Sequence, residues 1–176
     1  MKFTATSIEG VILMEQEKIQ DERGFFARTY CRNEFAKQGI NFQPIQESTS
    51  FNHKTGTLRG MHFQKIPSEE QKLVRATRGA IYDVALDLRK SSKTYFQSFG
   101  LELSAENGAA LFLPKGIAHG FLTLKDNTEI LYLIDTLYEP GLSSGVRWND
   151  PAFAISWPAP PKIISAKDES WPPYEK

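Results

Sequence analysis

The chain contains only three histidines, His53, His62 and His119. Histidine titrates near neutral pH, so it is the side chain that most often serves as a general acid or base. No His-x-His pair occurs, and so small a number nearly excludes a histidine-rich metal site. Proton transfer is therefore the first chemistry to consider.

His62 lies in the segment Gly56–Gln64, three residues after Arg59. If this segment is a strand, His62 and Arg59 face opposite ways, unless a bulge re-aims one of them. At the mouth of a barrel, His62 is a candidate general base. The alternative is a hydrogen-bonded histidine of the core.

His119 lies in the segment Pro114–Phe121, where a Pro-x-Gly turn precedes the start of a strand. This pattern is typical of a rim loop that holds a histidine within reach of solvent. The alternative is a turn that only sets strand register.

Tyr132 shares one strand face with Ile130 and Ile134. A tyrosine among apolar neighbours usually belongs to the core, with its hydroxyl tied to a partner. Its phenol is also a workable proton donor if it points into a cavity.

Arg59, Lys72 and Arg75 are cations in strand segments. Cations inside a barrel need anionic partners, because an unpaired buried charge is costly. Carboxylates can supply these partners, and so can an anionic ligand. Because the arginine fork binds two phosphate oxygens, the pattern is compatible with a phosphorylated ligand. The candidate carboxylates are Asp83, Asp87 and Asp168.

Short strands separated by turns must position these residues. Residues 82–89 alternate between two faces. One face holds Tyr82, Val84, Leu86 and Leu88, and the other holds Asp83, Asp87 and Arg89. Similar runs occur at 99–103, 111–113, 121–124 and 129–134, with turn residues between them. The spacing predicts an all-β fold, an antiparallel jelly-roll β-barrel forming a single domain over residues 1–176.

Two segments differ from this pattern. A short helix is predicted at Asn33–Gln38, with Asn33 as its N-cap and Gly39 as its left-handed stop. Beyond Asp150, closely spaced prolines disfavour regular structure, and tryptophans indicate an ordered coil that packs against the domain.

Composition excludes several functions. The 21 Lys+Arg balance 21 Asp+Glu, so the chain lacks the basic field expected for binding nucleic acid. Its apolar runs are too short to span a membrane, and its first residues lack the apolar core of a signal peptide. The single cysteine, Cys31, excludes an internal disulfide and favours a cytoplasmic location. P-loop, Rossmann and Gly-x-Ser-x-Gly motifs are missing from the sequence.

A series of motifs runs in order along nearly the whole chain, from about Phe3 to Pro172. They are Asp21-x-Arg23-Gly24-x-Phe26, Gln46, Ser50, Leu58–Gln64, Lys72–Arg75, Asp83-Val84-Ala85-x-Asp87-x-Arg89, Leu103-Ser104, Pro114-x-Gly116-x-Ala118–Phe121, Trp148–Pro151 and Ile164-Ser165-x-Lys167-Asp168. With these motifs the chain resembles the dTDP-4-dehydrorhamnose 3,5-epimerases, members of the cupin-like jelly-roll group.

The resemblance implies four catalytic residues. His62 matches the general base, and Asp168 matches the carboxylate paired with it. Tyr132 matches the general acid, and Lys72 matches the cation that stabilises the enolate oxygen. No metal and no cofactor is implied.

The resemblance also implies residues that bind the substrate, a nucleotide-linked 4-keto-6-deoxy sugar used in deoxysugar biosynthesis. Matches within one subunit are Gln46, Ser48, Arg59, His119, Tyr138 and Lys167. Arg23 and Phe26 match residues that are lent to the neighbouring site in a homodimer with exchanged N-terminal strands.

Four positions depart from the family pattern. Arg28 and Ser143 stand where glutamate is usual, Ser48 stands where asparagine is usual, and Leu133 replaces the lysine that usually follows the tyrosine. These changes leave open the nucleotide base and whether C3, C5 or both are inverted. Two other functions remain as alternatives: a metal-dependent cupin and a non-catalytic sugar-nucleotide binder.

Overall fold

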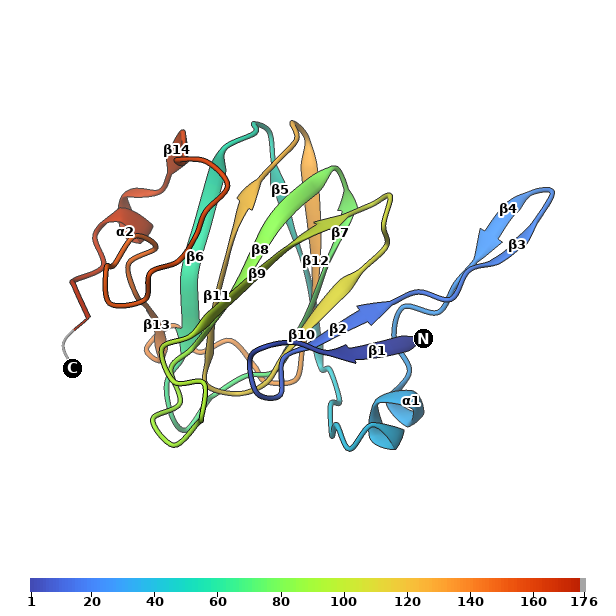
Figure 1. Ribbon diagram of the computed structural model, residues 1–176, viewed down its shortest axis with the longest axis horizontal. Helices are drawn as coiled ribbons and strands as arrows, with labels where there is room; N and C mark the ends of the chain where they lie inside the picture. The colour runs from blue at the N-terminus through green and yellow to red at the C-terminus, as the bar shows by residue number, and fades with distance from the viewer. Residues whose placement is uncertain (175–176) are drawn as a thin grey trace.

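The fold is a barrel of two sheets packed face to face (Figure 1), described for residues 1–174 by a computed structural model. In spatial order, the first sheet contains β1 (Lys2–Ala5), β2 (Ile12–Glu15), β10 (Ala110–Leu113), β7 (Lys72–Arg78), β12 (Thr128–Ile134) and β5 (Gln46–Asn52). The second contains β13 (Ser143–Gly145), β6 (Thr57–Gln64), β11 (Ile117–Thr123), β8 (Ala80–Asp87) and β9 (Ser98–Ser104). The strands along both sheets pair antiparallel, which confirms the predicted all-β jelly-roll fold.

The main core lies between the two sheets. Val74 and Ile130 reach it from the first sheet, and Ile81, Ala85 and Phe121 reach it from the second. Strand β8 alternates as predicted, and its other face packs in a separate apolar cluster that includes Val84 and Leu86. The inward face of β8 therefore also carries its aspartates. Because a buried carboxylate must find donors, these aspartates determine where polar networks form inside the barrel.

Residues 146–174 pack against the second sheet. Phe153 and Trp157 join the apolar cluster of Val84 and Leu86, and the Trp157 ring lies 6.4 Å from that of Tyr82. This tail is mostly irregular. It also contains two short elements that the sequence pattern did not predict, β14 (Ile163–Ile164), which runs parallel to β6, and α2 (Ala166–Glu169).

The predicted helix is confirmed as α1 (Arg32–Lys37), although its capping residue was predicted wrongly. Cys31, not Asn33, occupies the N-cap, because Asn33 already lies in the first helical turn. Gly39 follows with φ +75°, as expected for a left-handed stop. Phe35 anchors the helix against the aromatic ring of Phe112.

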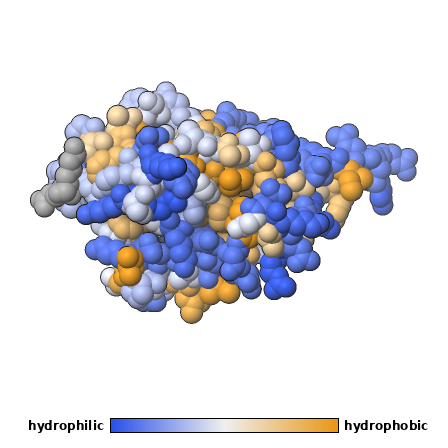
Figure 2. Space-filling view, turned by 60° about the horizontal axis from the view of Figure 1, so that its bottom comes forward, coloured by the Kyte–Doolittle hydropathy of each residue, from blue (hydrophilic) through white to orange (hydrophobic). Residues whose placement is uncertain are grey.

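A hairpin of β3 (Ile19–Asp21) and β4 (Gly24–Phe26) extends away from the barrel (Figure 1). Its apolar side chains are open to solvent, with Ile19, Phe25 and Phe26 exposed by 71, 56 and 67%. Hydrophobic surface on this projection is visible in Figure 2. Within residues 1–174, none of the helices has the length and apolar character needed to cross a membrane.

Candidate active site

A cavity of about 270 Å³ lies between the sheets and gathers most of the predicted catalytic residues. Its lining comes from both sheets. The first sheet contributes Ser50, Lys72, Tyr132 and Ile134, and the second contributes Arg59, His62, His119 and Phe121.

His62 and Arg59 line the same cavity although regular alternation would place them on opposite faces. The register of β6 against β11 shifts between these two positions, which is the bulge that the sequence analysis allowed as an exception. Gly60 makes the shift possible, because it has φ +135° and a Cβ there would lie 2.5 Å from the Cα of Gly120. Met61 is turned instead into an apolar cluster.

His62 is paired with Asp168, which reaches it from α2 in the tail. Nε2 of His62 lies 2.6 Å from Oδ1 of Asp168, and the second carboxylate oxygen accepts a hydrogen bond from the Gly60 N–H at 3.4 Å. Burial opposes ionisation of Asp168. Hydrogen bonds from His62, Gly60 and Ser165 outweigh that effect and lower the pKa of Asp168 below its ordinary value.

An ionised Asp168 can only accept hydrogen bonds, so Nε2 of His62 is the donor and Nδ1 remains free to take a proton. The His62 side chain is 38% exposed, whereas that of Asp168 is 6% exposed. The pair therefore combines an accessible base with a buried carboxylate that orients it.

A second histidine–aspartate pair lies deeper in the barrel. Nε2 of His119 is 2.7 Å from Oδ1 of Asp83, and both residues are buried. Within residues 1–174, Oδ2 of Asp83 has no hydrogen-bond partner. Asp83 was predicted as a candidate partner for buried cations, whereas its partner here is His119.

Tyr132 and Lys72 reach the cavity from the sheet opposite His62. Burial raises the pKa of Tyr132, and the negative charge of Asp83 raises it further. Tyr132 therefore keeps its proton at neutral pH and can serve as a donor. The ammonium of Lys72 lies 2.7 Å from Oε1 of Glu70.

Arg59 is held by Asn52, a residue that was not predicted from the sequence. Its Nε donates to Oδ1 of Asn52 at 2.8 Å, and Asn52 is buried. Glu70 was missed as well. Glu70 could have been found from the sequence, because it lies two residues before Lys72. In an extended chain, residues two apart point to the same side. No local pattern indicated Asn52, because it meets Arg59 across the turn between β5 and β6, two strands that lie in different sheets.

The remaining predicted binding residues of the barrel lie at or beyond the cavity. Ser48 is exposed on β5 opposite Tyr132, on the strand face that Ser50 shares. The side-chain oxygen of Gln46 accepts a hydrogen bond from the Tyr138 N–H at 2.9 Å, while Tyr138 itself is exposed. Lys167 is exposed beside the Trp171 ring, with 5.7 Å between Nζ and the ring centroid.

Two predicted binding residues lie far from the cavity lining, on the projecting hairpin. Arg23 pairs with Asp21 at 2.6 Å, and Phe26 is exposed. Two of the positions that depart from the family pattern have clear neighbours. Arg28 pairs with Glu34 at 2.9 Å, and Ser143 on β13 lies opposite Gln64 on β6.

The site offers proton transfer across a cavity. His62 on one wall can accept a proton, Tyr132 on the other wall can donate one, and Lys72 places a cation in the same lining. Residues 1–174 contain no cluster of three or more His, Cys, Asp or Glu side chains arranged to hold a metal ion.

The chain matches known proteins in both sequence and structure. The family model described as dTDP-4-dehydrorhamnose 3,5-epimerase matches residues 5–176. A relative from Methanothermobacter thermautotrophicus with that name is 43% identical over 99% of this chain and 95% of its own length. The crystal structure of the Bacillus anthracis enzyme, with TDP and PPi bound, has a TM-score of 0.94 at 42% identity, covering 97% of this chain and 98% of that one.

A further solved structure carries a narrower description. It is ChmJ from Streptomyces bikiniensis, a 3'-monoepimerase in complex with dTDP-quinovose, with a TM-score of 0.87 at 32% identity over 95% of this chain and 85% of that one. With a family model over nearly the whole chain and relatives of this identity, the protein belongs to the dTDP-4-dehydrorhamnose 3,5-epimerase family.

Proposed function

We propose that the protein inverts C3 and C5 of a dTDP-linked 4-keto-6-deoxyhexose through an enolate, without a metal or redox cofactor. One observation carries the proposal. The histidine–aspartate pair and the tyrosine lie on opposite walls of one cavity, and inversion needs a base and an acid on opposite faces of a carbon.

The first half of the reaction is proton removal. A 4-keto group acidifies the protons at C3 and C5, because the carbanion delocalises onto the carbonyl oxygen. His62 takes the proton through Nδ1, and Asp168 holds the imidazolium that forms. Lys72 stabilises the negative charge that develops on the oxygen.

The second half is proton return from the other side. Tyr132 donates its proton to the carbon face opposite His62, and burial of the phenol keeps that proton available at neutral pH. Proton exchange with solvent then frees His62 of its proton and returns one to Tyr132, and repetition at the second carbon, after the sugar has shifted, completes a double inversion.

Binding of a dTDP-sugar is supported by the relatives, whose structures hold TDP or dTDP-quinovose. Arg59 and His119 hold the sugar or its diphosphate, with Gln46, Ser48 and Tyr138 near the nucleotide and sugar. Lys167 would contact the ligand only at the outer edge of the site.

We also propose a cytoplasmic homodimer. The projecting hairpin exposes apolar side chains, which a second copy would cover. Arg23 and Phe26 would then complete the neighbouring site, because their own cavity is lined by other residues.

The test is incubation of the protein with dTDP-4-keto-6-deoxyglucose in deuterated water, followed by NMR. Deuterium at both C3 and C5 is the expected result. Deuterium at C3 alone would replace the double epimerase by the alternative 3-epimerase. No exchange with dTDP-, GDP-, CDP- or UDP-linked 4-keto sugars would contradict the proposal.

Two variants separate the acid from the base in the same assay. His62→Ala should lose exchange by about 10³-fold, because removal of a general base costs roughly 10²–10⁴-fold. Tyr132→Phe should keep much of the exchange and lose inversion. Equal exchange by His62→Ala and wild type would favour the non-catalytic binder.

A further inference from the structure

Glu70 and Lys72 form an ion pair where β7 begins. Oε1 of Glu70 lies 2.7 Å from Nζ of Lys72, and the two side chains are only 11 and 13% exposed. Ion pairs on an open surface contribute little, but a largely buried pair is held in one geometry and loses less to solvent screening.

The carboxylate of Glu70 is itself fixed from the other side. Its Oε2 accepts a hydrogen bond at 3.3 Å from Nε2 of Gln64, which is 4% exposed. The side-chain oxygen of Gln64 in turn accepts the Glu139 N–H at 2.8 Å. A buried amide at the end of β6 thus orients the carboxylate that holds the lysine.

Lys72 lines the cavity, but Glu70 does not. The carboxylate is therefore placed to act on the ammonium without touching a bound sugar. A lysine side chain has four rotatable bonds, and fixing such a chain costs rotamer entropy. An anchored ammonium has lost that freedom before substrate arrives.

We propose that Glu70 is a positioning residue, which fixes the Lys72 ammonium at the cavity wall so that it meets the enolate oxygen rather than the diphosphate. The inference rests on the proposed function of the site. It assigns the linked side chains of Gln64, Glu70 and Lys72 a part in the chemical step, not in substrate binding.

The kinetic test compares Glu70→Ala, Glu70→Gln and the control Glu69→Ala. Glu69 is the adjacent acid, and its carboxylate makes no hydrogen bond or ion pair within residues 1–174. Glu70→Ala should lower kcat about tenfold with little change in KM, since a small misplacement of a catalytic group can cost up to ~10²-fold. Glu70→Gln keeps an acceptor for Lys72 and should recover most of the loss, while Glu69→Ala should match wild type.

A double-mutant cycle tests whether Glu70 acts through Lys72. If it does, Lys72→Met and Lys72→Met/Glu70→Ala should have the same kcat within about twofold, because the second change removes nothing further. Additive losses would overturn the inference and make Glu70 a general stabiliser. An unchanged or raised kcat for Glu70→Ala would overturn it as well.

A measurement independent of turnover is ¹⁵N relaxation of the lysine ammonium groups, with the Lys72 signal identified by its loss in Lys72→Met. Lys72 should be immobile in wild type and as mobile as surface lysines in Glu70→Ala. Equal mobility in both proteins would overturn the inference. Inactive wild type on every 4-keto sugar would instead contradict the epimerase function, whatever the mobility of Lys72.

Discussion

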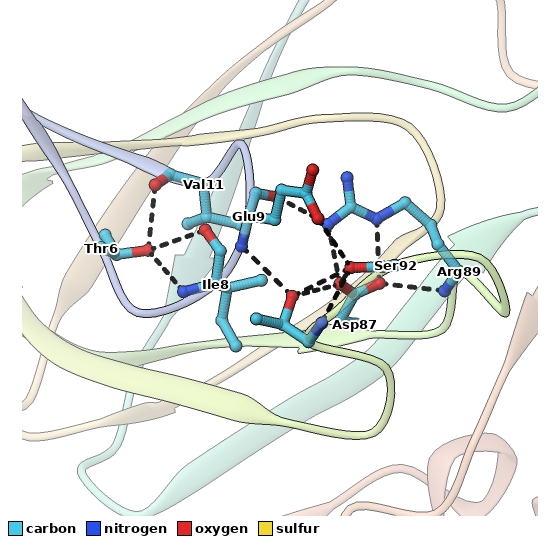
Figure 3. Close-up of polar contacts among 8 residues, drawn as sticks. Thr6, Ile8, Glu9, Val11, Asp87, Arg89 and Ser92 are labelled. Atoms are coloured by element: carbon cyan, nitrogen blue, oxygen red, sulfur yellow. Dashed lines mark hydrogen bonds and ion pairs between the residues drawn. The ribbon is translucent and has the colours of Figure 1, made fainter.

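Two buried aspartates of this protein have very different surroundings. Asp87, at the end of β8, accepts hydrogen bonds from the Arg89 N–H, from the Arg89 guanidinium and from the hydroxyls of Ser92 and Thr94, all at 2.6–2.9 Å (Figure 3). Asp168 accepts from His62 and, weakly, from Gly60. Both carboxylates have lowered pKa values, so both are ionised at neutral pH.

The difference lies in what each partner can still do. Arg89 has no proton to exchange at neutral pH, and its guanidinium also donates to the backbone oxygen of Glu9 at 2.6 Å (Figure 3). The Asp87 network therefore joins the β1–β2 turn to the β8–β9 loop. His62 keeps one ring nitrogen free in a cavity. A carboxylate whose donors are fixed supports structure, whereas one that holds a titratable ring supports proton transfer.

The same substitution at the two sites should separate these roles, with the largest effect at Asp168. Asp168→Asn removes the charge that stabilises the His62 imidazolium, and turnover should fall about 10³-fold or more. Thermal unfolding should shift less than for Asp87→Asn, because the Asp168 carboxylate accepts fewer hydrogen bonds and its partner His62 is partly exposed. A loss of stability with normal turnover would reverse the assignment.

Asp87→Asn should have the opposite outcome. An amide group would face donors that now bind a carboxylate oxygen, and breaking a buried ion pair costs about 3 kcal/mol. The midpoint of thermal unfolding should fall by roughly 6–12 °C for a chain of this size. Turnover measured well below that midpoint should remain within about twofold of wild type, and a large loss of kcat with normal stability would contradict the structural role.

The smallest of the three expected effects is on the free energy of unfolding at acid pH. Burial opposes ionisation of Asp87, but Arg89, Ser92 and Thr94 outweigh it and lower its pKa to about 2. A group with a lowered folded pKa stabilises the fold above its unfolded pKa and loses that contribution as pH falls through the folded one. About 2 kcal/mol should thus be lost between roughly pH 4 and pH 2. Denaturant titrations across that range should show a shallower decline for Asp87→Asn than for wild type.

The fold was predictable from sequence because alternation and turn residues are local signals. The alternation at residues 82–89 correctly predicted the two faces of β8, and Gly39 correctly predicted where α1 ends. The sequence pattern missed β14 and α2, because a two-residue strand and a four-residue helix carry no periodicity of their own. They form because the tail packs against β6.

The candidate site was predictable in part. The motifs supplied His62, Asp168, Tyr132 and Lys72, and the structure brings these four together. Two contacts were not predictable: that of Asn52 with Arg59, which lie on consecutive strands of different sheets, and that of His119 with Asp83, which are 36 residues apart. The hairpin residues Arg23 and Phe26 match the family motif but lie outside the cavity of their own chain.

The sequence by itself determined the fold class and which residues of each strand face the core. Through family motifs it also determined the residue types of the site. These depend on short-range periodicity and on residue identity. Only the tertiary structure decided which polar groups meet. The bulge at Gly60 places Arg59 and His62 on one wall, and α2 delivers Asp168 to that wall. Pairings of this kind depend on strand register and on packing of the tail, and such long-range contacts leave no local trace in the chain.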